Sequence, residues 1–115
     1  DFGRTHRFMV QSPVLIKRRL EDGKQKYFFP KDAVANQYLT ETMQHKLQRA
    51  GLPKDIEVSF DSAYENPRTK LVSYKGINIK GTLCPVVVSG DSRAVQFAWE
   101  VGVGNSTGIG FGALK

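Results

Sequence analysis

Near its carboxyl end the chain reads Gly102-Val103-Gly104-Asn105-Ser106-Thr107-Gly108-Ile109-Gly110-Phe111-Gly112. Five of these eleven residues are glycine, in a chain that has eleven glycines in all. Because glycine lacks a Cβ atom, it adopts positive φ and lets the backbone approach a partner closely. The stretch, which we call the glycine loop, therefore predicts either a tight connection beside a packed helix or a set of backbone N–H groups that binds an anion such as phosphate.

The elements on either side of the glycine loop differ in kind. Residues 92–101 are mostly apolar and predict a largely buried helix, with Gly90-Asp91-Ser92 as its cap. Residues 110–115 predict a short strand. The loop thus leaves a helix and enters a strand, whereas Walker and dinucleotide-binding loops leave a strand and enter a helix. This order excludes those two kinds of nucleotide site.

A second helix is predicted in the first half of the chain. Apolar side chains recur every three to four residues between positions 35 and 50, which is the spacing of a helix with one buried face. Pro30-Lys31-Asp32 opens this helix with Asp32 as its N-cap, and Gly51 and Pro53 end it.

The remaining segments alternate between apolar and polar residues, as strands do. Pro13, Gly81 and Pro85 predict breaks or bends, because proline cannot donate to a ladder and glycine weakens a strand. The predicted strands cover residues 7–19, 24–29, 55–64, 70–74, 77–88 and 110–115, after a linker or tail of residues 1–6. The order βαββαβ predicts a single ferredoxin-like α+β domain over residues 7–115, with two helices on one face of a four-stranded antiparallel sheet.

The charge balance indicates the class of partner. The 115 residues include 17 Lys and Arg against 11 Asp and Glu, a net charge of +6. Such an excess favours a polyanion, above all nucleic acid, although a basic solvated surface also explains it. Lys17, Arg18 and Arg19 form the basic triplet, and Lys80 lies on the polar side of a predicted strand.

The same composition limits other functions. A single cysteine, Cys84, excludes an internal disulfide, and two histidines 39 positions apart match no metal-ligand spacing. We therefore predict no metal and no cofactor. The apolar runs are shorter than the ~20 residues that a membrane helix needs, and we expect a cytoplasmic protein.

Three sequence features together resemble one protein family. In the glycine loop, five residues separate two glycine–apolar–glycine motifs. This arrangement is similar to the carboxyl-terminal loop of the RAMP superfamily, the RNA-binding proteins of CRISPR systems. Two further sequence motifs narrow the resemblance to the second domain of the CRISPR-associated endoribonuclease that cuts precursor CRISPR RNA within its repeats. These motifs are Ala94-Val95-Gln96-Phe97-Ala98-Trp99-Glu100-Val101 and Phe8-Met9-Val10-Gln11-Ser12-Pro13-Val14-Leu15-Ile16. The resemblance covers residues 8–115.

The resemblance implies a function and a division of labour. In that family two ferredoxin-like domains stand in tandem, and CRISPR repeat RNA lies across their basic surface. Cleavage there is metal-independent: the 2′-hydroxyl of the RNA attacks the adjacent phosphate and leaves a cyclic phosphate. The general base commonly comes from the first domain, so this chain would be the second domain and inactive by itself. Its implied partners are the repeat RNA, the missing amino-terminal domain and, as further options, other CRISPR complex subunits or a second copy.

Candidate RNA-binding residues come from the resemblance and from the charges. The resemblance assigns the loop glycines to holding RNA, while hydroxyls and basic side chains offer further phosphate contacts. The five residues between Gly104 and Gly110 include no Lys or Arg, where the family usually has one, so Lys115, Lys80 or the basic triplet would supply the charge. The full candidate set is Gly102, Gly104, Ser106, Thr107, Gly108, Gly110, Gly112, Lys17, Arg18, Arg19 and Lys80.

Two histidines are the weak candidates for a general base. His45 lies on the side of the predicted helix opposite the apolar stripe, and His6 lies in the linker. We interpret both as surface residues, because catalysis by His45 would require the polar face of the helix to meet the scissile phosphate. No catalytic residue is assigned to this chain.

Three other interpretations stay open. An RNA-recognition motif has the same topology but reads bases with aromatic side chains on its sheet, whereas Phe8, Phe60 and Phe28 or Phe29 are more easily placed in the core. The chain can also be a non-catalytic RNA-binding or scaffold subunit of a CRISPR complex. A stand-alone ferredoxin-like module for regulation or dimerisation is the third.

Overall fold

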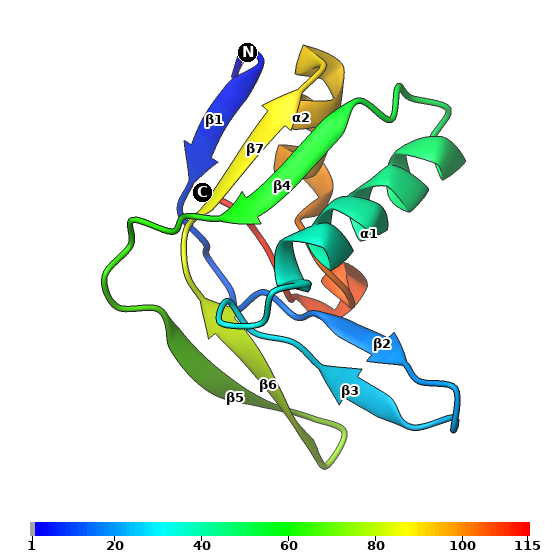
Figure 1. Cartoon of the computed structure of the whole chain (residues 1–115), viewed down its shortest axis with the longest axis vertical. Coiled ribbons are helices and arrows are strands. Elements are labelled where there is room, and N and C mark those ends of the chain that lie inside the picture. Colours follow the sequence, from blue (N-terminus) through cyan, green and yellow to red (C-terminus); the bar gives the residue numbers. More distant parts are fainter. Residues whose placement is uncertain (1) are drawn as a thin grey trace.

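The computed structural model describes residues 2–115, and its largest sheet, which we call the central sheet, has three antiparallel strands in the order β1-β7-β4 (Figure 1). Two separate two-stranded sheets, β2-β3 and β5-β6, extend away from it. In chain order the elements are β1 (Thr5–Phe8), β2 (Lys17–Arg19), β3 (Gln25–Tyr27), α1 (Ala35–Arg49), β4 (Ile56–Phe60), β5 (Arg68–Tyr74), β6 (Ile77–Leu83), β7 (Val86–Gly90), α2 (Ser92–Val101) and the 3₁₀ turn η1 (Thr107–Ile109).

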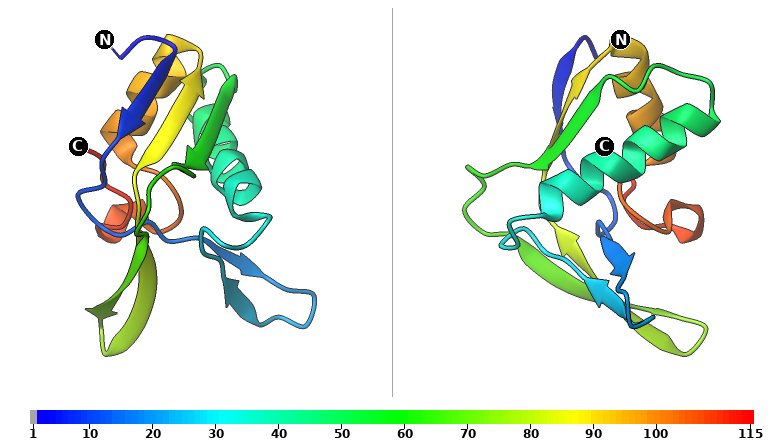
Figure 2. Two further views of the ribbon diagram at one scale, coloured as in Figure 1. Left: turned by 60° about the vertical axis from the view of Figure 1, so that its left-hand side comes forward. Right: turned by 45° about the vertical axis from the view of Figure 1, so that its right-hand side comes forward.

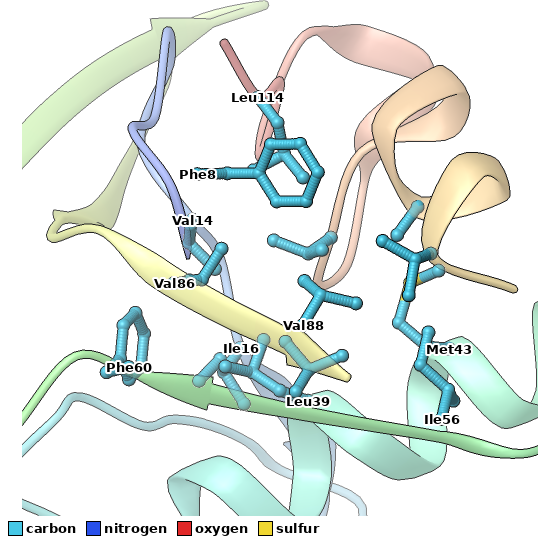
Figure 3. Close-up of a cluster of buried hydrophobic side chains, with 14 of the residues drawn as sticks. Phe8, Val14, Ile16, Leu39, Met43, Ile56, Phe60, Val86, Val88 and Leu114 are labelled. Atoms are coloured by element: carbon cyan, nitrogen blue, oxygen red, sulfur yellow. The ribbon is translucent and has the colours of Figure 1, made fainter. Parts of the chain in front are cut away.

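Both helices cover the same face of the central sheet, as predicted (Figure 2). Helix α1 packs mainly on β4, and α2 packs on β7 and β1. The alternation of β4 buries Ile56, Val58 and Phe60 toward this layer, and Val86 and Val88 of the middle strand are fully buried. Figure 3 shows Ile56, Phe60, Val86 and Val88 in one core with Leu39 and Met43 of α1, and Val58 belongs to the same core. Among residues 2–115, neither helix is long and apolar enough to cross a membrane.

The helix ends follow the predicted signals with one exception. Asp91 caps α2 by accepting a 2.9 Å hydrogen bond from the backbone N–H of Arg93, and Gly51 follows α1 with a φ of +72°. Asp32, in contrast, is not the N-cap of α1, which begins at Ala35. Its carboxylate instead accepts a 2.7 Å hydrogen bond from the N–H of Phe29, so it stabilises the turn that precedes the helix.

Proline divides the two longest predicted strands. The strand predicted over residues 7–19 is replaced by β1, two isolated bridges and β2, and the residues around Pro13 change partner. The strand predicted over residues 77–88 is divided at Pro85 into β6 and β7. Each break lies where proline removes a ladder donor. One continuous sheet therefore becomes three smaller ones.

The two ends of the chain also differ from the prediction. Residues 5 and 6 belong to β1 rather than to a linker, and residues 110–115 form no strand. Instead, the carboxyl end makes one bridge, Val10 to Leu114, and paired hydrogen bonds of 3.1 and 2.8 Å between Met9 and Lys115. The α+β class and the two helices are confirmed, whereas the four-stranded ferredoxin-like sheet is not, because the central sheet has three strands.

Candidate nucleic-acid interface

The strand β2, the helix α1 and the glycine loop meet at a surface hollow of about 440 Å³. Four of its lining side chains are Lys or Arg, one is an imidazole, and Glu41 is the single carboxylate. The lining residues are Lys17, Arg18, Arg19, Gln25, Glu41, Thr42, His45, Arg49 and Asn105. Tertiary structure thus gathers the basic triplet, His45 and a loop residue, which are far apart in the sequence, around one hollow with an excess of basic side chains.

Arg18 has a structural role within the basic triplet. Its Nη2 atom donates hydrogen bonds to the carbonyl oxygen of Tyr38 at 3.0 Å and to Oγ1 of Thr42 at 3.2 Å. The guanidinium also lies 4.5 Å from the centre of the Tyr38 ring and 3.7 Å from Glu41. These contacts fix β2 against α1. Within residues 2–115 no ion pair involves Lys17 or Arg19, whose charges face the hollow without a carboxylate partner.

Three glycines of the loop are buried packing positions. Gly102, Gly104 and Gly112 all have positive φ. A Cβ atom at Gly104 would lie 2.5 Å from the carbonyl oxygen of Leu15, and one at Gly102 would lie 2.8 Å from that of Gly112. A Cβ at Gly112 would collide with the carbonyl of Val103. The close backbone approach explains why these positions need glycine without any contact to RNA.

The exposed part of the loop is its tip, η1 with Gly110, where Gly108, Ile109 and Gly110 face solvent. Most loop amides are already used: Asn105 N–H donates to the Leu15 carbonyl at 2.7 Å, and Gly112 N–H donates to the Pro13 carbonyl at 2.7 Å. Within residues 102–112, all of which the structure describes, only the amides of residues 104 and 106–108 donate to no backbone carbonyl. The predicted cradle of amides is therefore limited to a short stretch.

Lys46 of α1 places a cation against the glycine loop, which has no Lys or Arg of its own, and sequence reasoning missed it. Its Nζ atom donates hydrogen bonds to the Gly104 carbonyl oxygen at 2.9 Å and to Oγ1 of Thr107 at 3.2 Å. Burial, with repulsion from Arg49, lowers the pKa of Lys46 from 10.5 to about 8. Its place in the last turn of α1, beside the buried Leu47, indicates a half-buried lysine, but no local pattern reveals which segment it contacts.

Family comparison identifies the class of this domain. The sequence profile described as "CRISPR associated protein Cas6, C-terminal" matches residues 2–115. The chain belongs to the Cas6 C-terminal family. Among curated proteins, no sequence matches it.

Solved structures share the fold of this Cas6 C-terminal domain. The structure described as "Characterization of a Cas6-related gene from Pyrococcus furiosus" is 23% identical with a TM-score of 0.80, and our chain covers 49% of it. "An RAMP protein binding different RNA substrates" is 21% identical with a TM-score of 0.80 and 49% coverage. Both matches span 100% of our chain. A Cas6 product complex is 18% identical with a TM-score of 0.69, over 96% of our chain and 50% of that one. The chain thus spans about half the length of these structures.

Three predicted residues of the Cas6 C-terminal domain lie outside the hollow. His6 is part of β1, not of a linker, and its ring packs 4.9 Å from Phe2 and 4.5 Å from Phe8. Lys80 lies on β6 and lines a different depression, with Lys31 and Pro67 among its neighbours. Lys115 pairs through its backbone with Met9. Neither His6 nor these two lysines lines the hollow with the basic triplet.

Proposed function

We propose that this chain binds CRISPR repeat RNA in the hollow between β2, α1 and the glycine loop, as the carboxyl-terminal half of an endoribonuclease that cuts precursor CRISPR RNA. The observation that carries the proposal is the convergence of Lys17, Arg19 and Arg49 around one hollow that Asn105 of the glycine loop also lines, in a member of the Cas6 C-terminal family. Unpaired cations around a concave surface bind a phosphate backbone by releasing its counterions.

The proposed contacts are to phosphate rather than to stacked bases. Lys17, Arg19 and Arg49 supply charge, and Thr107 and the free amides of the loop tip supply hydrogen bonds. The outer face of the central sheet favours no stacking, because the paired residues Arg7, Val87 and Ser59 on that face include no aromatic ring. The aromatic residues Phe8, Phe28 and Phe60 are buried instead.

The cleavage chemistry belongs to the longer protein that we propose. There the 2′-hydroxyl of the RNA attacks the adjacent phosphate without a metal, and the products are a cyclic phosphate and a free 5′-hydroxyl. A base must take the 2′-proton. We expect it from a preceding domain, and His45 is the one imidazole that this chain places in the hollow. We further propose that this reaction takes place in the cytoplasm, where repeat transcripts are made.

The experiment measures the affinity of labelled repeat RNA for the chain by fluorescence anisotropy over a range of salt concentrations. Wild type should bind with a steep negative slope of log affinity against log salt, about 0.7 per phosphate contact on a single strand. Arg19→Glu should weaken binding and make the slope of log affinity against log salt less steep. Lys54→Glu is the matched control, because it changes the net charge equally on the exposed connection between α1 and β4.

The same titration separates the proposal from its alternatives. Equal losses in the Arg19→Glu and Lys54→Glu variants would contradict the hollow as the binding surface. Absence of RNA binding together with a tight dimer in light scattering would favour the dimerisation module. RNA binding by a full-length protein that never cleaves would favour the scaffold subunit.

A further inference from the structure

Lys46 connects two segments that lie far apart in the chain. It lies on the last turn of α1, one position after His45, which lines the hollow, and one before Leu47, which is fully buried. From there its Nζ atom reaches the Gly104 carbonyl, 58 residues further along, and the Thr107 hydroxyl, 61 residues further along. One ammonium group therefore holds both the base and the tip of the glycine loop.

The base of the loop is held without Lys46, whereas the tip is not. Backbone hydrogen bonds of 3.0 Å from Val103 to Gly112 and of 2.7 Å from Gly112 to Pro13 fix the base. At the tip, the amides of Ile109 and Gly110 donate only to carbonyls inside the loop. Among residues 2–115, Lys46 is the one side chain from outside the loop that hydrogen-bonds to η1. Without it, the 3₁₀ turn has no polar connection to α1.

The electrostatic setting of Lys46 is unfavourable for its positive charge. Residues 102–112 contain no charged side chain, and no ion pair in the described chain involves Lys46. Burial removes part of the hydration of the ammonium, and Arg49, in the same last turn of α1, repels it, so the pKa of Lys46 falls to about 8. A lysine kept in an unfavourable position beside a proposed binding surface is a candidate for function.

We propose that Lys46 is a positioning residue that fastens the tip of the glycine loop to α1 and so fixes the loop hydroxyls and amides relative to Lys17 and Arg19. The proposal rests on the RNA-binding function proposed above. Hydrogen bonds to two acceptors on the loop restrict its rotation as well as its distance from α1. A loop held in place before binding avoids the entropy cost of ordering it around the RNA.

Three variants of the chain test the fastening. Lys46→Met removes the donors and the charge but keeps an unbranched apolar stem, Lys46→Arg keeps the charge, and Thr107→Val removes one acceptor without changing any charge. Lys54→Met is the control, because that exposed lysine lies away from the hollow. Amide hydrogen exchange of Ile109 and Gly110, followed by NMR, reports the order of the loop tip, and repeat-RNA anisotropy over several salt concentrations reports binding.

Fastening predicts that Lys46→Met and Thr107→Val both accelerate exchange at Ile109 and Gly110 and both weaken RNA binding, by up to about tenfold for the lysine variant. The salt slope of binding should stay near that of wild type, because neither variant removes a cation that contacts phosphate. Lys46→Arg should recover part of the affinity, and Lys54→Met should resemble wild type in both measurements.

Two results would overturn the proposal. Unchanged exchange in Lys46→Met would show that the loop tip needs no fastening; if that variant fails to fold, unchanged exchange in Thr107→Val overturns it equally. If the salt slope of RNA binding becomes less steep by about 0.7 in Lys46→Met, while Thr107→Val matches wild type in exchange and affinity, Lys46 is a phosphate contact instead. A wild-type chain that binds no repeat RNA would refute the proposed function, while the exchange data still decide whether the fastening exists.

Discussion

The backbone N–H of Lys17 donates a 2.9 Å hydrogen bond to Oδ1 of Asn105, 88 residues away. The N–H of Asn105 donates in return to the carbonyl oxygen of Leu15 at 2.7 Å. Asn105 thus makes one hydrogen bond in each direction with the segment that leads into β2, as a residue of a neighbouring strand would. The glycine loop and the basic triplet are consequently one structural assembly. A substitution in either segment should therefore alter the position of the other.

Replacing Asn105 with leucine should separate these two segments. The variant keeps a similar volume but leaves the half-buried N–H of Lys17 without its acceptor, which costs about 1–3 kcal/mol of the free energy of unfolding. RNA affinity should fall as well, because β2 is no longer held to the loop. Urea unfolding and anisotropy measure the two effects. Asn78→Leu on the exposed face of β6 is the control, and equal losses in both variants would contradict the assembly.

The two arginines of the basic triplet should behave differently. Arg18→Ala removes the hydrogen bonds to Tyr38 and Thr42 and should lower the free energy of unfolding by about 1–3 kcal/mol. Arg19→Ala removes an exposed side chain and should change stability by less than about 0.5 kcal/mol while it weakens RNA binding. Thermal or urea unfolding of both variants checks this. A marked loss of stability in Arg19→Ala would refute the assignment.

Alanine substitutions of the loop glycines should differ in their effect on stability according to how buried each glycine is. Gly112→Ala places a Cβ against the Val103 carbonyl at a positive φ and should destabilise the fold by about 3 kcal/mol or more. Gly104→Ala should also impair folding, since its Cβ would lie 2.5 Å from the Leu15 carbonyl oxygen. Gly108→Ala meets nothing within 4 Å and is the control. Denaturant unfolding that ranks Gly108→Ala with Gly112→Ala would disprove the packing role.

The lowered pKa of Lys46 makes a prediction about stability and pH. Its pKa is about 8 in the folded chain and near the ordinary 10.5 when unfolded, so between these values the unfolded chain binds more protons. The free energy of unfolding should therefore rise with pH through this window, because the cost of the partly buried charge disappears. Arg49 is the charged neighbour responsible for part of the shift, and the loop adds no titratable group.

Unfolding of wild type and of Lys46→Met, measured from pH 7 to pH 10.5, checks this prediction. The difference between them should be constant below about pH 8 and should then change in favour of wild type. RNA binding should show the opposite trend, since the ammonium that holds the loop is lost. A difference independent of pH would mean that the lysine titrates normally.

Local patterns predicted the elements well where the signal was local. The periodic apolar residues placed α1, the Gly90-Asp91 pair placed the start of α2, and the alternation of β4 gave its buried face. Pro13 and Pro85 were predicted as breaks, yet they divided one sheet into three. The sequence shows where proline lacks a backbone N–H donor, but it does not show which strand each segment then pairs with, because strand pairing depends on contacts between distant segments.

The candidate site was predictable only in part for the same reason. The basic triplet, His45 and the glycine loop were predicted from residue type. The structure places the triplet, His45 and one loop residue, Asn105, around one hollow, while His6 and Lys80 lie elsewhere. Lys46 and Asn105 carry no pattern of their own. Their importance comes from contacts across 58 and 88 residues, respectively, which no local window contains.

By itself the sequence determined the family, the two helices and the excess of positive charge, because glycine spacing, apolar periodicity and composition are properties of single segments. Tertiary structure alone decided which glycines pack and which face solvent, which arginine is structural, and which lysine reaches the loop. Those distinctions depend on burial and on hydrogen-bond partners, and both exist only after distant segments have come together.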